Sequence, residues 1–428
     1  MLINRALIVA VTLAVSATAA PTRVPTTASG ISIPLRKRAT YTQQNGVFDK
    51  DKAIAASVGT INKHRQNLLN LVKNVGDSAL HYGAEIKAPA VLPYDVERRM
   101  KKRQAEALID LENDVEWAGT ISIGTPAREF LIDFDTGSAD LWVPSAACTS
   151  VTCEAKSKFN ANLSSTAEAQ VEKFSILYGD GSSVLGPVYT DTVTVAGIQA
   201  TKQYFSAVTT LSASFAADPI DGVLGLAFPA ISNLNHSPFF NTAKAEGSLA
   251  VNQFGFCLAA NNSELYLGGT NAKKFVGDIE YHAIDTTTGF WQLTTAEVKV
   301  GSATAVAGIE TIIDSGTTIM YGPPAAVKEV YAKVAGSALY DAANGYYSYP
   351  CDSAPEIAFN WGGADWAISA ANFNLGKTEE GSKLCVGALA GQDLGLGAGV
   401  WLLGDSFMKN VYTAFDFELK AVGFAKLA

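Results

Sequence analysis

Histidine is scarce in this 428-residue chain: only four occur, and none lies at the helical or Cys-His spacing of a metal site. A serine-hydrolase elbow, Gly-x-Ser-x-Gly, is missing, although Gly404-Asp405-Ser406 resembles part of one. Nucleotide-binding loops and flavin fingerprints are missing as well. We therefore expect neither a metal nor a cofactor. The histidines are His64, His81, His236 and His282.

Charged residues are also few, at 17% of the chain against 48% hydrophobic residues, which excludes extended disorder and favours a large packed core. The 15 prolines and 37 glycines are scattered without a period, as expected for many turns. Short alternating runs of β-branched and aromatic residues, such as Phe174–Tyr178 and Thr190–Val195, predict strands. We expect a mainly β protein.

Long apolar runs are missing after the first twenty residues. Those residues combine Arg5, an apolar stretch over Ala6–Val15 and the small residues Ala17-Thr18-Ala19, which predicts a secretory signal peptide over residues 1–20. The stretch is shorter than the ~20 residues that span a bilayer, and residues 422–428 lack the tail of a lipid-anchor signal. We expect a secreted product without a membrane anchor. The expected destination is extracellular, although a signal peptide also fits a vacuolar one.

Five cysteines suit an oxidising compartment. Pairing Cys148 with Cys153 closes a small loop, and pairing Cys351 with Cys385 closes a larger one, although the sequence alone permits other pairings. Cys257 is then left over in an apolar run, where we expect a buried, unreactive thiol.

The charges divide the chain into a basic front and an acidic body. Residues 1–103 carry 16 Lys and Arg against 6 Asp and Glu, a net +10, whereas residues 104–428 carry 16 against 35, a net −19. Parts of opposite charge attract each other at neutral pH, and the attraction weakens as carboxylates protonate. The asymmetry predicts a pro-segment over residues 21–103 that is released in acid.

A run of basic residues, Arg98–Arg103, ends the basic front and resembles a site for processing proteases of the secretory pathway. We therefore expect the mature chain to begin at Gln104. A second basic cluster, Arg36–Arg38, leaves the internal processing of the pro-segment open. The net-acidic, secreted body argues against a nucleic-acid partner.

An internal repeat lies in the body of the chain. Leu131–Ser138 is echoed by Glu310–Thr317, each with an Asp-x-Gly turn after an apolar run, at an offset of 179 residues. The same offset separates two apolar-Gly elements, Val223–Gly225 and Leu402–Gly404. In both halves the glycine follows the aspartate by 90 residues. Two weak motifs at one shared offset predict a duplicated β protein with two lobes, each of which contributes one aspartate.

The paired aspartates, Asp135 and Asp314, predict a catalytic site in which two carboxylates share one proton. A single Asp-Thr-Gly predicts only a turn. Two adjacent carboxylates do not both ionise, so one acts as a base toward water while the other donates to a carbonyl oxygen, and the dyad titrates as one unit. The flanking glycines let backbone amides approach, and the flanking hydroxyls orient the carboxylates. These supporting residues are Thr136, Gly137, Ser138, Ser315, Gly316 and Thr317.

From about residue 113 to residue 428 the sequence resembles the pepsin family of aspartic endopeptidases, and its motifs occur in the family's order. Ser315 stands where threonine is frequent, and Ala139 where serine is usual. Ser315 keeps the hydroxyl that reaches across between the lobes, so we expect activity to survive. The matching motifs are Gly119–Pro126, Asp135–Ser138, Leu141–Pro144, Tyr178–Ser182, Asp221–Leu226, Asp314–Thr317, Leu403–Asp405 and Phe415-Asp416.

The resemblance implies a mainly β, bilobal pepsin-like fold, with two pseudo-symmetric lobes and the active-site cleft between them. We expect the N-terminal lobe over residues 104–300 and the C-terminal lobe over residues 301–428. It also implies that a flap closes over the substrate and that Trp142 packs beneath it; a glycine-rich tip suits a lid that moves and excludes water. The flap residues are Tyr178, Gly179, Asp180, Gly181 and Ser182.

The resemblance extends to the pro-segment, where residues 31–37 resemble the strand with which zymogens of this family begin. In such zymogens a lysine blocks the catalytic aspartates, and Lys63 is our candidate for it. The alternative is that Lys63 lies on a solvated basic helix face. The expected partners are polypeptide substrates, the chain's own pro-segment as an intramolecular inhibitor, and pepstatin-type inhibitors. We expect a monomer.

Three acidic residues, Asp133, Asp140 and Asp180, resemble the fungal branch of the family, in which an acidic flap tip accepts lysine before the cleaved bond. We expect hydrophobic residues on both sides of the scissile bond, with lysine accepted at the first position. Asp180, together with Ser182 and Asp133, is the expected recognition site for that lysine. The alternative is that Asp180 is a turn residue facing solvent.

Two other readings of the paired carboxylates remain. Glycosidases use two carboxylates as well, but not in matched Asp-x-Gly turns. A secreted binding protein that keeps the fold without activity is the second alternative, because a fold alone does not prove function. Such relatives usually lose a catalytic aspartate, a glycine or the flap tyrosine, and all of these are present here. Glycan occupancy stays open at the sequons of Asn162, Asn235 and Asn261.

Overall fold

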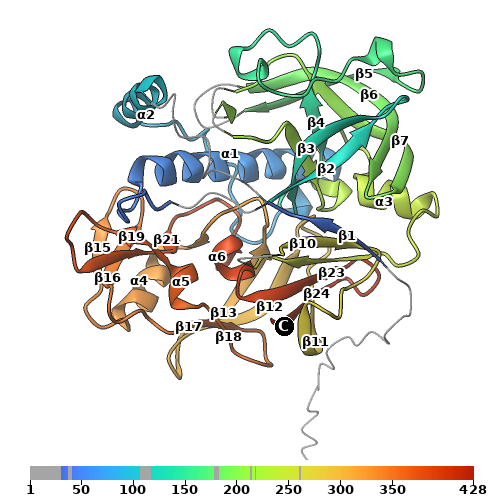
Figure 1. The fold of residues 1–428 in the computed structure, drawn as a ribbon. Helices are drawn as coiled ribbons and strands as arrows, with labels where there is room; N and C mark the ends of the chain where they lie inside the picture. The colour runs from blue at the N-terminus through green and yellow to red at the C-terminus, as the bar shows by residue number, and fades with distance from the viewer. Residues whose placement is uncertain are drawn as a thin grey trace, which may run out of the picture.

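The computed structural model describes residues 30–36, 41–106, 117–177, 183–212, 215–216, 218–259 and 262–428, and of residues 101–106 and 177 only the backbone. The predicted signal peptide, the predicted flap residues 178–182 and the sequon at Asn261 lie outside the described residues. Strands dominate the described part, in four sheets, and the predicted mainly β fold is confirmed. Figure 1 shows the helix α1 (Lys50–Asn74) crossing the middle of the molecule between two groups of strands.

The first group of strands is a seven-stranded sheet that begins at residue 118, which we call the N-terminal sheet. Its central strands β4 and β8 are largely buried on both faces. Each of them pairs on one side with a parallel neighbour, as is typical of strands covered on both faces. The outer strands alternate between buried and exposed side chains. In sheet order the strands are β2 (Ala118–Ile123), β3 (Arg128–Asp135), β8 (Gly222–Gly225), β4 (Leu141–Pro144), β7 (Ile198–Val208), β6 (Ser183–Val195) and β5 (Glu168–Leu177).

A second seven-stranded sheet, the C-terminal sheet, repeats this arrangement in the other half of the chain. Its strands β13 and β22 run parallel, as β3 and β8 do in the first sheet. In sheet order it contains β18 (Trp366–Ala367), β17 (Ile357–Asn360), β12 (Gln292–Val300), β13 (Ala303–Ile313), β22 (Val400–Leu403), β14 (Met320–Gly322) and β21 (Leu389–Gly391). A four-stranded sheet lies beside it, with β15 (Ala338–Asp341), β16 (Tyr346–Pro350), β20 (Leu384–Gly387) and β19 (Asn374–Lys377).

A six-stranded sheet takes strands from three distant parts of the chain. Its edge strand β1 lies in the predicted pro-segment, where Ile33 is buried opposite Leu265. The predicted lobe boundary at residues 300 and 301 falls in the turn of the β12–β13 hairpin, after the strands β9, β10 and β11 of this sheet. In order the strands are β1 (Ile31–Pro34), β10 (Glu264–Leu267), β9 (Gln253–Cys257), β23 (Val411–Asp416), β24 (Ala421–Leu427) and β11 (Phe275–Ala283).

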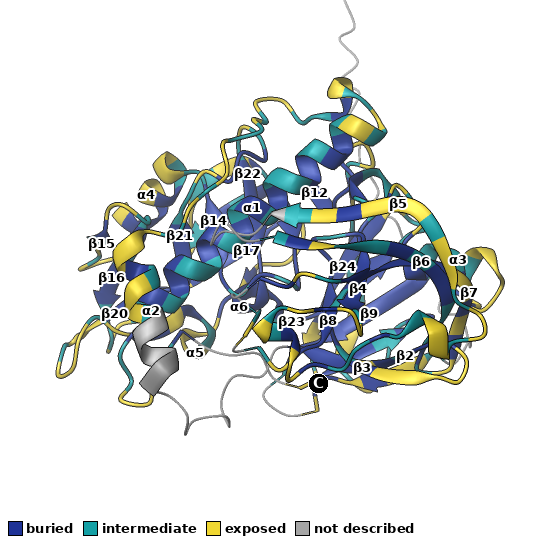
Figure 2. Cartoon of the chain, turned by 90° about the horizontal axis from the view of Figure 1, so that it is seen from above, coloured by how far each residue is buried: buried dark blue, intermediate teal, exposed yellow. Residues whose placement is uncertain are grey.

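The helix α1 begins after Asp49, whose carboxylate accepts a hydrogen bond from the Lys52 amide at 3.2 Å. It buries apolar residues such as Leu68 and Leu71 against both halves of the molecule. Figure 2 shows α1 as a helix of mainly buried and intermediate residues. In the described part of the chain no helix is long and apolar enough to cross a membrane. The other α-helices are α2 (Tyr94–Glu106), α3 (Phe239–Ala245), α4 (Pro324–Ala332), α5 (Ala370–Phe373) and α6 (Asp405–Met408).

The predicted processing run Arg98–Arg103 lies within α2, which packs on α1. Val96 is buried against Ile54 of α1. The Arg99 guanidinium binds the buried carboxylate of Asp51, with Nη2 at 2.9 Å from Oδ1. The basic run is therefore held as a helix on the surface of the predicted pro-segment.

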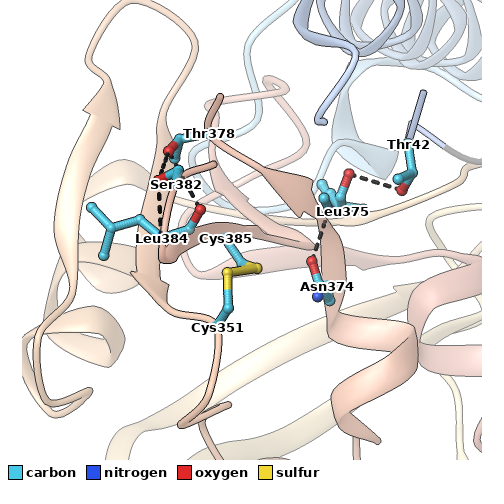
Figure 3. The surroundings of a disulfide bond; sticks show 9 residues. Thr42, Cys351, Asn374, Leu375, Thr378, Ser382, Leu384 and Cys385 are labelled. Atoms are coloured by element: carbon cyan, nitrogen blue, oxygen red, sulfur yellow. Dashed lines mark hydrogen bonds between the residues drawn. A yellow bond between two sulfur atoms is a disulfide. The ribbon is translucent and has the colours of Figure 1, made fainter. Parts of the chain in front are cut away.

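Two disulfides are formed, Cys148–Cys153 and Cys351–Cys385, with sequence separations of 5 and 34 residues. Figure 3 shows the second, which joins the end of β16 to β20. Close to it the Thr42 hydroxyl of the predicted pro-segment donates to the Leu375 carbonyl at 2.9 Å. Cys257 is buried without a disulfide, and burial raises the pKa of its thiol, which keeps it in the unreactive protonated form.

Candidate active site

The two aspartates of the repeat lie at equivalent points of the two seven-stranded sheets. Asp135 is the last residue of β3 and pairs with Gly225 of the parallel strand β8. Asp314 follows β13, and its amide donates to the carbonyl of Leu403 in β22 at 3.0 Å. Both side chains are buried, with exposed fractions of 4% and 0%. Each carboxylate is thus held by a pair of parallel, buried strands.

The turn after each aspartate supplies two hydrogen-bond donors to its carboxylate. At Asp135 they are the Gly137 amide, 2.8 Å from Oδ1, and the Ser138 hydroxyl, 2.6 Å from Oδ2. The second turn repeats this arrangement, in which the Gly316 amide lies 2.9 Å from Asp314 Oδ1 and the Thr317 hydroxyl lies 2.7 Å from Oδ2. These donors orient both carboxylates and compensate part of the cost of burying them.

The glycines of both turns are needed because the two turns face each other. A Cβ atom at Gly137 would collide with the carboxylate of Asp314, and one at Gly316 would collide with that of Asp135. Any side chain at either position would therefore push the two halves apart. The repeated Asp-x-Gly motif thus serves the close approach of the two carboxylates.

Two hydroxyl groups lock the two turns together beneath the carboxylates. The Thr136 hydroxyl donates to the Ile313 carbonyl at 2.9 Å and accepts from the Ser315 amide at 2.9 Å. The Ser315 hydroxyl donates to the Phe134 carbonyl at 2.7 Å and accepts from the Thr136 amide at 3.0 Å. All four residues are buried. Serine at position 315 therefore makes the cross-connection that its hydroxyl was expected to make.

The Lys63 side chain of α1 reaches both carboxylates. Its Nζ lies 3.2 Å from Asp135 Oδ1 and 2.8 Å from Asp314 Oδ2, and the side chain is 19% exposed. Burial lowers the pKa of Lys63, but the two carboxylates outweigh burial and hold it above its ordinary value. Lys63 is therefore charged, and it does not lie on a solvated helix face.

The neighbouring His64 also contacts the site, which the sequence analysis did not foresee. Its Nε2 lies 3.2 Å from Asp314 Oδ2, and its ring is fully buried beside Phe290. Among the described residues its Nδ1 has no hydrogen-bond partner. Burial lowers the pKa of His64, and Lys63 adds to this, while the hydrogen bond to Asp314 opposes it. The only sequence signal was its position next to Lys63.

The two carboxylates differ in their affinity for a proton. Burial raises the pKa of Asp135; Lys63 opposes this, and the charge of Asp314 adds to it. Burial also acts to raise the pKa of Asp314, but Lys63 and then His64 outweigh it and hold that pKa well below its ordinary value. The surroundings thus separate the pKa values of the two adjacent carboxyl groups. Such a separation suits a pair that holds one proton.

A row of asparagines extends the contact of α1 with the N-terminal half. The Asn67 amide group donates to the Gly137 carbonyl at 2.8 Å, and that of Asn70 donates to the Ile231 carbonyl at 3.0 Å. The Asn74 amide group reaches the carbonyls of Ala230 and Ser232 at 3.1 and 2.8 Å. Positions i, i+3 and i+7 share one helix face, so the spacing of the three asparagines in the sequence indicates a polar face of this helix.

The structure describes only some of the other expected site residues. Trp142 is buried in the N-terminal sheet, with its ring 5.1 Å from that of Phe215. Asp133 is buried in β3, two residues before Asp135, and pairs with Ala118. The flap residues Tyr178–Ser182 lie outside the described part, between β5 and β6. The disulfides and Lys63 are described above.

Comparison with known proteins agrees with this geometry. Residues 116–427 match the profile of the family described as eukaryotic aspartyl protease. An aspartic protease of Phaffia rhodozyma is 44% identical over 328 residues, which cover 75% of this chain and 79% of that protein. Major aspartyl peptidase 1 of Cryptococcus neoformans var. grubii is 32% identical over 374 residues, which cover 81% and 76%. Pepsin A of Sus scrofa is 35% identical over 337 residues, which cover 76% and 86%. With two turns that bring two aspartates together, this chain belongs to the eukaryotic aspartyl protease family and is an aspartic-type endopeptidase by descent.

Proposed function

We propose that the chain is the zymogen of an acid-acting aspartic endopeptidase in which Asp135 and Asp314 form the catalytic pair. The observation that carries the proposal is the single ammonium group of Lys63 within 3.2 Å of both buried carboxylates. An ammonium group that bridges two carboxylates in this way would exclude the reacting water from the same place. The pro-segment over residues 21–103 is then an intramolecular inhibitor.

The proposed reaction needs one proton on the pair. The ionised carboxylate takes a proton from water as the water oxygen attacks the carbonyl carbon of the scissile peptide, and the protonated carboxyl donates to the carbonyl oxygen. As the tetrahedral intermediate collapses and its C–N bond breaks, the carboxyl that took the proton from water delivers it to the leaving nitrogen. The other carboxylate recovers a proton from a hydroxyl of the intermediate, which becomes the new carboxylic acid. The pair ends with one proton, as it began. The turn donors around Asp135 and Asp314 keep both carboxylates in place throughout.

The remaining expectations complete the proposal. The enzyme is secreted, to the medium or to a vacuole, and acts as a monomer on polypeptides. Asn162 and Asn235 are exposed in the structure, so glycans there would meet solvent. The mature chain begins at Gln104, after release of the strand β1, of α1 and of residues 94–103 of α2.

Specificity is proposed to rest on hydrophobic pockets on both sides of the scissile bond, with lysine accepted at the first position. Asp180, with Ser182 and Asp133, is the proposed site for the lysine ammonium group. The support comes from the acidic residues in the sequence, which resemble those of the fungal branch of the family.

Replacing the flap aspartate tests this specificity. In Asp180→Ala, kcat/KM for a peptide with lysine at the first position should fall about 10-fold, the effect of a charge-assisted bond, while that for a leucine peptide changes little. Steady-state kinetics on the two peptides measure the ratio. Unchanged cleavage of the lysine peptide would remove Asp180 from the recognition site.

Replacing either catalytic aspartate tests the mechanism. In acid-activated Asp135→Asn or Asp314→Asn, cleavage of an unfolded protein at about pH 3–4 should fall at least about 10²- to 10⁴-fold, because one carboxylate can no longer exchange a proton. Asp365→Asn, on an exposed carboxylate paired with Lys299, is the matched control and should keep full activity. Pepstatin should abolish the activity of the control. A folded, processed wild type that cleaves nothing would favour the inactive binding protein instead.

Removing the Lys63 ammonium group tests the proposed inhibition. Lys63→Met leaves two buried carboxylates without their cation, which should cost about 3 kcal/mol or more of pro-segment docking. The variant should bind a fluorescent pepstatin analogue near neutral pH, where the wild type does not. Lys73→Met, on an exposed lysine of the same helix, should behave as the wild type. If neither variant bound the pepstatin analogue near neutral pH, the inhibitory role of Lys63 would be contradicted.

Replacing His64 tests the pH of release. His64 has a docked pKa below its ordinary value of 6.5, so only the released form gains a proton as pH falls past 6.5, and docking weakens. The depressed pKa of Asp314 acts the same way only below its ordinary value of 3.8. The charged groups facing His64 are Lys63, Asp314 and Asp135.

His64→Gln keeps a donor but does not titrate, so its pH midpoint for pro-segment release should be lower than that of the wild type. Release is followed by gel electrophoresis after timed incubation at stepped pH. His236→Gln, on a histidine stacked against Tyr204, serves as the control and should not move the midpoint. A midpoint that is the same or higher in His64→Gln would overturn the assignment.

A further inference from the structure

A buried carboxylate outside the catalytic pair, Asp140, holds the loop that follows η5 (Pro229–Ile231). Its Oδ1 accepts the Ser232 hydroxyl at 2.7 Å and the Leu234 amide at 3.1 Å, and its Oδ2 accepts the Asn233 amide at 2.7 Å. Asp140 is only 7% exposed. Three donors from consecutive residues on one carboxylate fix the path of the backbone through position 233.

The side chain of Asn233 projects from this fixed backbone to the strand β5. Its Nδ2 donates to the Ser175 carbonyl at 3.1 Å, and its Oδ1 lies 3.5 Å from the Ser175 amide. The side-chain amide of Asn233 thus pairs with both the N–H and the C=O of Ser175, as the backbone of a neighbouring strand would.

The strand β5 needs such a partner because it is the edge of the N-terminal sheet. On one side it pairs with β6, where Ser175 lies opposite Leu185. Figure 2 shows β5 as a largely exposed strand beside β6. Edge strands leave a row of backbone groups unpaired and are the least restrained part of a sheet. The flap residues proposed above begin at residue 178, three residues after Ser175.

We propose that Asn233 anchors the first strand of the flap hairpin, and that Asp140 is a positioning residue that acts through Asn233. The inference rests on the proposed function, because it assigns β5 and β6 to the flap of that enzyme. An anchor at Ser175 restrains the described end of β5. Less ordering of β5 then accompanies each substrate-binding event, which lowers the entropic cost of binding.

The predicted pro-segment touches the same anchor. The Asn233 Nδ2 group lies 3.4 Å from Asn70 Oδ1 of α1, so its two hydrogens serve Ser175 and Asn70 together. Asn70 in turn is bonded to the Ile231 carbonyl. Release of α1 leaves Ser175 as the partner of this amide. The anchor is therefore assembled in the zymogen and retained in the active form.

Three variants of the full-length chain, studied before and after acid activation, test the proposal. Asn233→Ala removes the amide group. Asp140→Asn is isosteric, but either orientation of the new amide places its NH₂ against a backbone N–H donor of Asn233 or Leu234, so the loop must shift. Asn160→Ala is the matched control. Asn160 lies in the same half of the molecule, and its side-chain oxygen accepts a hydrogen bond from the Asn162 amide.

Two readouts separate anchoring from general stability. Hydrogen exchange in peptides covering residues 168–177 should be about 3- to 10-fold faster in Asn233→Ala, the effect of losing one or two hydrogen bonds, with exchange in β23 and β24 unchanged. After activation, KM and the inhibition constant of pepstatin should rise about 3- to 10-fold while kcat changes less than about 2-fold. The control should match the wild type in both.

The double variant decides whether Asp140 acts through Asn233. The proposal expects the KM of Asp140→Asn/Asn233→Ala to equal that of Asn233→Ala, because the positioned group is already gone. The proposal would be overturned if the KM increases of the two single variants multiplied in the double variant. It would also be overturned if hydrogen exchange in β5 were unchanged in Asn233→Ala. Hydrogen exchange needs no activity, so a wild type that failed to cleave would reject the proposed function while the anchor itself could still be tested. If Asp140→Asn fails to fold, the exchange rates and KM of Asn233→Ala decide alone.

Discussion

Two carboxylates buried side by side are the constraint on which the rest of this molecule depends. Like charges out of water repel strongly, so each needs donors and the pair needs either a proton or a cation. Asp135 and Asp314 obtain an amide and a hydroxyl from their own turns, and Lys63 supplies the cation. The backbone that presents them is correspondingly rigid, because each lies at the end of parallel strands buried on both faces.

The duplicated architecture follows from the same constraint. One Asp-x-Gly turn cannot provide a second carboxylate, and two copies meet only if nothing stands between them. Glycine at positions 137 and 316 removes the obstruction, and the crossed hydroxyls of Thr136 and Ser315 tie the two copies together. The six-stranded sheet joins the two halves at a distance from this contact.

The predicted pro-segment is complementary to this site in more than charge. A helix uses its own backbone N–H groups internally, so α1 offers side-chain amides to the carbonyls around the site. At the catalytic pair its polar contacts are Lys63, whose raised pKa keeps it charged in acid, and the buried His64, whose pKa is lowered. The acid-sensitive groups of the contact are therefore His64 and the carboxylate of Asp314. Acid therefore acts on the contact at several points while the strands beneath keep their hydrogen bonds.

Sequence by itself determined the mainly β, two-lobed class, the family and the offset of the two aspartates, because a duplication leaves matched motifs at a constant spacing. It also singled out Lys63 as a candidate, without showing what the lysine touches. Only the tertiary structure placed His64 on Asp314, Asn67, Asn70 and Asn74 on backbone carbonyls, and Asn233 on the edge of β5. Those contacts join residues 58 to 250 positions apart. A local pattern can mark a polar helix face, as the asparagine spacing does, but it does not identify the partner, since tertiary packing decides which surfaces meet.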